Sequence, residues 1–132
     1  MRTADVTING KRHVLCCNLR FVRSASERYG SMRGMYDALE TADDVKALDE
    51  AVWVVAQMMA AGSRYAAEMG MENAAPLTAE ELLDLCDLSD FRALRNAIIR
   101  TMTAGKSRNV EIETLTGDDD GEEKNGETTR ES

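Results

Sequence analysis

The chain is short, acidic and poor in aromatic side chains. Its 132 residues fit one domain, and a hydrophobic share of 43% with only 5% aromatics favours packed helices over a β-sandwich. The formal net charge of −8, from 16 basic and 24 acidic side chains, opposes binding to nucleic-acid phosphates and to anionic membranes.

The first structured segment, residues 6–17, predicts a β-hairpin. Its Asn-Gly pair at positions 9 and 10 favours a type I′ turn, because both residues tolerate positive φ. On one face of this hairpin, Val6 and Ile8 are expected to lie opposite Lys11, His13 and Leu15. This face is therefore predicted to be apolar. A hairpin alone is marginal in water, so we expect it to pack on helices or to pair with another sheet, with Ile8 as an anchor.

Two short helices are expected next. Asn18 is a suitable N-cap for the first helix and Gly30 a suitable end, whereas Ser31 caps the second. The predicted apolar faces are Leu19, Val22, Ser26 and Tyr29 in the first helix, and Met32, Met35, Tyr36 and Leu39 in the second.

The longest predicted helix runs from about residue 42 to residue 69. Thr41 with Asp44 resembles a capping box at its start, and Gly70 closes it. An apolar seam continues through Val45, Leu48, Val52, Val55, Met59, Gly62, Ala66 and Met69. Trp53, Val54, Met58 and Tyr65 widen this seam, which predicts cover on at least two sides and places Leu48 and Trp53 in the core.

Two further helices complete the expected fold. Pro76 ends any preceding helix, Thr78 with Glu81 forms a capping box, and Asp87 or Ser89 begins the last helix, which Gly105 terminates. These patterns predict a mostly helical α+β domain over residues 1–105, with one hairpin and about five helices. Residues 106–132 are predicted to be a disordered acidic tail, in which VEIETL at 110–115 forms at most a transient strand.

Candidate residues for catalysis or metal binding are few. His13, Cys16 and Cys17 are suitable ligand types, but neighbouring strand residues point to opposite faces and no Cys-x-x-Cys pair or second histidine completes a site. We therefore predict no catalytic, cofactor-binding or metal-binding residue and no enzymatic activity. Three cysteines without an export signal favour a reducing cytoplasm, and the roles of these cysteines, Cys86 included, stay open.

Four arginines at positions 20, 23, 28 and 33 suggest an alternative function. Together with Phe21 and Tyr29 they would form a basic strip on the first two helices, as in a small helix-turn-helix DNA-binding regulator. The acidic net charge makes this the second choice, since arginines also occupy the solvent faces of ordinary amphipathic helices.

Methionine is the more informative feature. Eight methionines occur in the chain, and this flexible side chain serves either as core filling or as an adaptable binding surface. We expect a protein that binds other chains, and the predicted partner contacts are Ile8, Met58, Met59, Met69 and Met71.

The order of these segments resembles a known family. TINGK, a helix that ends in RYG, then SMRGMYDALE, VWVVAQMMAAGSRYAAEMG and PLTAEELLDL resemble the tail assembly chaperones of long-tailed bacteriophages, particularly those of prophages in Gram-positive hosts. The similarity extends from about residue 6 to residue 104. His13 and the Cys16-Cys17 pair depart from the family pattern in the hairpin.

The resemblance implies a non-enzymatic assembly factor in the host cytoplasm that is absent from the mature virion. Such a protein oligomerises around the tape measure protein, keeps it soluble and helps recruit tail tube subunits. The hairpin would then supply edge-to-edge contacts between chaperone subunits. A longer form made by ribosomal frameshifting near Gly105 is a further expectation, which the codons of the gene would test.

Overall fold

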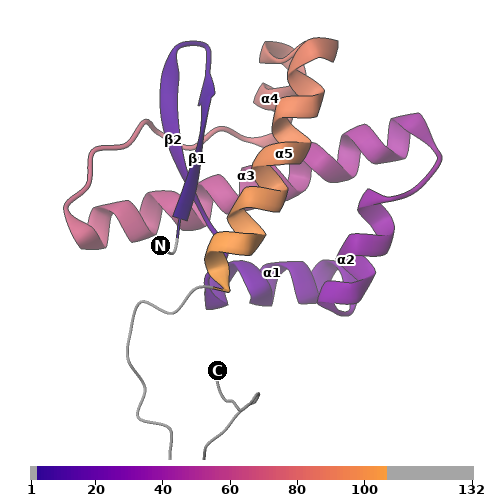
Figure 1. Cartoon of the computed structure of the whole chain (residues 1–132), viewed down its shortest axis with the longest axis horizontal. Coiled ribbons are helices and arrows are strands. Elements are labelled where there is room, and N and C mark those ends of the chain that lie inside the picture. The colour runs from indigo at the N-terminus through magenta and orange to yellow at the C-terminus, as the bar shows by residue number, and fades with distance from the viewer. Residues whose placement is uncertain (1–2, 107–132) are drawn as a thin grey trace, which may run out of the picture.

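The computed structural model describes residues 3–106 and has a hairpin followed by five helices (Figure 1). The strands are β1 (Thr3–Ile8) and β2 (Lys11–Cys16). The helices are α1 (Leu19–Tyr29), α2 (Met32–Leu39), α3 (Asp44–Met69), α4 (Ala79–Leu85) and α5 (Leu88–Gly105). This arrangement confirms the expected α+β class, whereas the predicted disordered tail lies outside the described residues.

The hairpin has the expected turn and register. Asn9 and Gly10 both have positive φ, 53° and 77°, and Val6 lies opposite His13. Four consecutive residues of β2, His13 to Cys16, are buried, which means that both faces of this strand are covered. Helix α3 packs on β2 and helix α5 packs along β1, so the hairpin lies on helices.

A glycine allows α3 and β2 to touch through their backbones. A Cβ atom added to Gly62, in the interior of α3, would lie 1.9 Å from the carbonyl oxygen of Val14. No larger side chain fits without a shift of one backbone, so Gly62 fixes how closely the strand crosses the helix.

The outer edge of β2 is covered by the extended segment that follows α3. The backbone N–H of Val14 donates to Asn73 Oδ1 at 2.8 Å, and the N–H of Ala74 donates to the carbonyl of Arg12 at 3.2 Å. On β1, the Arg100 guanidinium donates to the carbonyl of Asp5 at 3.1 Å. Backbone groups of both strands therefore have hydrogen-bond partners outside the hairpin.

Helix α3 carries the core through its middle, whereas its ends are exposed. The buried part of the predicted seam is Val52, Val55, Met59, Gly62 and Ala66. Trp53 packs partly buried against the core, but Leu48 is 37% exposed and its predicted core position is wrong. The helix also begins at Asp44 with Asp43 as its N-cap, because Thr41 Oγ1 accepts from the N–H of Asp43 instead of capping the helix.

Helix α1 is attached to α3 by a polar and aromatic cluster. The Tyr29 hydroxyl donates to Glu50 Oε1 at 2.5 Å, and the Tyr29 ring meets Trp53 edge to face with centroids 5.5 Å apart. Arg28 lies over the Trp53 ring at 4.6 Å and pairs with Glu50 at 3.2 Å. Burial and the hydrogen bond to the Glu50 carboxylate raise the pKa of Tyr29, so its hydroxyl keeps its proton.

Most predicted helix ends are confirmed. Asn18, Ser31 and Thr78 are N-caps, and Gly30 and Gly70 end their helices in the left-handed conformation. Two further expectations, one for α1 and one for α5, are wrong. Leu19 is 85% exposed, because α1 buries Phe21 and Ala25 instead. Gly105 does not terminate α5 from outside; it lies within the helix, where an added Cβ would be 2.9 Å from the Cys17 side chain.

Candidate partner-binding grooves

Two apolar grooves lie on the surface of the described residues, and the rims of the two grooves have opposite charge. The first groove, which we call the acidic groove, lies between α3, α4 and the start of α5 and encloses about 280 Å³. Leu82 and Leu94 are fully buried beneath it, whereas Leu83 and Leu88 on its rim are exposed. The complete lining is Leu48, Val52, Leu82, Leu83, Cys86, Asp87, Leu88, Phe91 and Leu94.

Short helix α4 gives the acidic groove its apolar rim. Its capping box, in which Thr78 and Glu81 each bond the other's backbone N–H, fixes the rotation of a helix of only seven residues. Successive helical residues point about 100° apart, so Leu82 turns inward while Leu83 and Leu85 stay exposed. A run of leucines that appears uniform in the sequence is therefore divided between the core and the surface.

Acidic side chains predominate in the segment that forms this groove, and the Arg95 guanidinium lies 5.9 Å from the centre of the Phe91 ring at one side of it. Between residues 77 and 91 the chain has five carboxylates and no lysine, arginine or histidine. Hydrogen bonds from the Ser89 hydroxyl and from the backbone N–H of Asp90 lower the pKa of Asp87, so this N-cap is ionised at neutral pH. A partner that covers the groove therefore meets an apolar floor with acidic surroundings.

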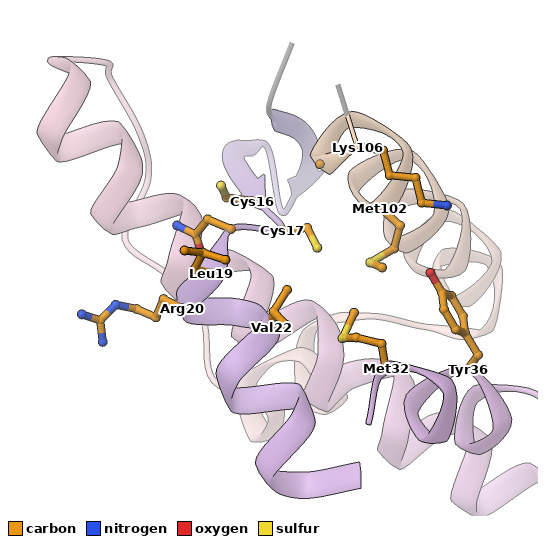
Figure 2. Close-up of a pocket in the computed structure, with 11 residues that line it drawn as sticks. Cys16, Cys17, Leu19, Arg20, Val22, Met32, Tyr36, Met102 and Lys106 are labelled. Carbon is orange, nitrogen blue, oxygen red and sulfur yellow. The ribbon is translucent and has the colours of Figure 1, made fainter. Parts of the chain in front are cut away.

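The second groove, which we call the basic groove, lies between α5 and the α1–α2 pair. It consists of two hollows of about 770 and 210 Å³ that share Tyr36, Met102 and Lys106. Figure 2 shows the side chains of Cys17, Met32 and Met102 directed into the larger hollow. Lys106 lies at one side of the hollow, and at the other side the Arg20 side chain extends away from it. Arg95 and Glu40 line the smaller hollow, so three cations and one carboxylate surround this groove.

The structure divides the predicted partner contacts into two sets. Ile8, Met58 and Met59 are buried in the hydrophobic core, which corrects their assignment as surface contacts. Met69 is 60% exposed at the end of α3 and Met71 is 37% exposed just beyond it. Contact with a partner stays a prediction for these two residues, neither of which lines either groove.

His13 and the cysteines are mostly shielded from solvent. His13 is 2% exposed, and its Nδ1 atom has no hydrogen-bond partner among residues 3–106. Burial, assisted by the charge of Lys11, lowers the pKa of His13. Cys16 is buried, and burial raises the pKa of the half-buried Cys17 and Cys86 thiols. Within the described part of the chain, no three His, Cys, Asp or Glu side chains are grouped to hold a metal ion.

The predicted arginine strip is partly occupied by neighbouring carboxylates. Arg28 pairs with Glu50 and stacks on Trp53, and Arg23 lies 3.6 Å from Glu27 on an exposed helix turn.

The helices among residues 3–106 include none with the length and apolar character needed to cross a membrane.

Comparison with known proteins identified no relative. No family model, no curated protein and no solved structure matches the chain.

Proposed function

We propose that the protein is a tail assembly chaperone that covers apolar helical segments of the tape measure protein with its acidic groove. The observation that carries the proposal is the group of exposed leucines on α4 and at the start of α5, above a floor of buried leucines. In this function the protein acts in the host cytoplasm, associates with further copies of itself and helps recruit tail tube subunits.

The shape and chemistry of the groove suit an amphipathic helix. An apolar groove bordered by two short helical segments accepts the apolar side chains that a partner helix presents at positions i, i+3, i+4 and i+7. The carboxylates of α4 and of the first turn of α5 favour lysine or arginine beside that apolar stripe. A long helical chain with such stripes aggregates when they are exposed, so cover of this kind keeps it soluble.

Two leucines form a matched pair for the test. Leu88 and Leu19 are each the first residue of a helix, each follows an N-cap, and each is 85% exposed. Leu88 lines the acidic groove, whereas Leu19 lines the basic groove. Replacing either leucine by serine removes the same apolar area without changing charge or opening the core.

The experiment is co-expression of each variant with fragments of the tape measure protein encoded nearest to this gene. We expect Leu88→Ser to weaken the measured affinity for the fragment about tenfold, as expected for the loss of one buried leucine contact, and to return the fragment to the insoluble fraction. Leu19→Ser should behave like the parent chain. Equal affinities for the parent chain and the Leu88→Ser variant, or a fragment that stays soluble without this protein, would overturn the proposal.

Salt dependence provides a second measurement on the same complex. Because the carboxylates around the acidic groove lie at the surface, added salt screens their attraction for a basic partner. We expect the association rate to fall as salt rises, while the apolar contribution of Leu88 persists. An association rate that is independent of salt would contradict the assignment of a basic partner.

A further inference from the structure

The basic groove lies where the described chain ends. The backbone N–H of Lys106 donates to the carbonyl of Thr103 at 3.2 Å, which holds this residue on the last turn of α5. The side chain of Lys106 lines both hollows of the groove. Lys106, the last described residue, therefore lies at the groove.

The basic groove is apolar inside and short of negative charge. Leu19, Val22, Met32 and Met102 contribute to its lining, and Leu19 and Tyr36 are exposed there. Within residues 3–106, neither Arg20 nor Lys106 forms an ion pair with a carboxylate. A suitable occupant has apolar side chains for the interior and carboxylates for these two cations.

One segment of the chain has this composition. The sequence VEIETL at positions 110–115 contains Val110, Ile112 and Leu115, which are the only aliphatic or aromatic side chains among residues 107–132. Glu111 and Glu113 alternate with them. The three residues between Lys106 and Val110 span at most about 14 Å when extended, and the six residues of VEIETL span about 20 Å. The segment is thus tethered at high local concentration to a groove that it can reach.

We propose that residues 110–115 bind in the basic groove of the same chain, with Val110 and Ile112 against its methionines and the two glutamates beside Arg20 and Lys106. This intramolecular contact covers Cys17 and Leu19. It involves a different surface from the acidic groove, so it neither requires nor tests the proposed chaperone function.

The reactivity of Cys17 reports whether the groove is occupied. Cys17 lines the groove, Cys16 is buried, and the remaining thiol, Cys86, is removed by a Cys86→Ser background substitution in the full chain. In that background we expect Ile112→Ser to increase the rate of Cys17 modification by a soluble disulfide reagent about tenfold, because the apolar contact that holds the segment is lost. Ile112→Val keeps most of the apolar area and should retain the slow rate of the parent chain.

A synthetic peptide of residues 107–117 provides the complementary measurement. Added in excess to the Ile112→Ser variant, it should restore slow modification of Cys17. Equal rates for the parent chain and for Ile112→Ser would overturn the proposal, as would a peptide without effect. Protection that disappears on dilution of the parent protein would also overturn it, since the segment would then occupy the groove of another copy.

Discussion

The crossing of α3 with β2 and the acidic groove use apolar side chains in opposite ways. At the crossing, Gly62 brings two backbones into contact, and Asn73 and Ala74 occupy the outer edge of the strand. At the acidic groove, Leu83 and Leu88 are exposed above a closed floor. The first region has no room for another chain, whereas the second has apolar area that its own core does not use.

Helix α3 belongs to both regions. Its middle is buried by the hairpin and by α5, and its first turns reach the acidic groove through Leu48 and Val52. Because one rigid helix connects them, the stability of the crossing holds the groove in shape. We therefore expect substitutions at the crossing to change the free energy of unfolding, and substitutions on the groove rim to change binding.

Adjacent leucines on α4 should show the largest contrast. Leu82 is fully buried, so Leu82→Ala should lower the free energy of unfolding by about 3 kcal/mol through lost contacts and a cavity. Leu83 is 41% exposed, and Leu83→Ala should cost only about 0.5 kcal/mol. Urea unfolding of both variants measures the difference, and equal losses would show that the outer face of α4 is packed after all.

The crossing itself is tested at Gly62. Gly62→Ala places a methyl group against the Val14 carbonyl, and we expect a net loss of about 2 kcal/mol, because the strain exceeds the gain of about 1 kcal/mol in helix propensity. Ser63→Ala, one residue further along the same helix, is the control and should change the free energy of unfolding by less than about 0.5 kcal/mol. If Gly62→Ala stabilises the protein, the two backbones are not held in contact.

Local sequence signals predicted much of this fold. The Asn-Gly turn, the capping box at Thr78 and the left-handed Gly30 and Gly70 each depend on residues that are close together in the chain. Their chemistry acts over one or two turns, so a single sequence contains it. The class, the number of helices and most of the boundaries follow from these signals.

Burial was harder to predict, because it depends on contacts between distant residues. Leu48 and Met59 both belong to the predicted apolar seam of α3, yet only Met59 is buried. Such contacts join residues far apart in the chain, as in the hydrogen bond between Val14 and Asn73, which are 59 residues apart. The sequence did not predict the acidic groove for the same reason, although the leucines and carboxylates of residues 80–90 are the sequence feature that indicates it.

Asn73 tests the part of the crossing that the sequence did not reveal. Asn73→Ala removes the acceptor for the N–H of Val14 and leaves a buried donor without its partner, so we expect a loss of about 1.5 kcal/mol in unfolding free energy. Asn96→Ala, at an exposed position on α5, is the matched control and should change stability by less than about 0.5 kcal/mol. Hydrogen exchange at Val14 should accelerate only in the first variant.

The smallest expected effect is a dependence of stability on pH that originates at the crossing. Burial lowers the pKa of His13 below the value of 6.5 that it has when unfolded. The unfolded chain therefore binds a proton more readily than the folded chain, and stability should fall as the pH falls through 6.5 and continue to fall until the folded pKa is passed. His13→Phe removes the imidazole that binds this proton. As the pH falls from neutral to the onset of carboxylate protonation, the free energy of unfolding of this variant should therefore decline less than that of the parent chain. The acidic groove has no histidine, so binding through Leu88 should keep its affinity over the same interval. Parallel pH profiles for the parent chain and for His13→Phe would show that His13 accepts a proton equally well in the folded and the unfolded chain. That result would contradict the burial of His13 between the hairpin and the helices.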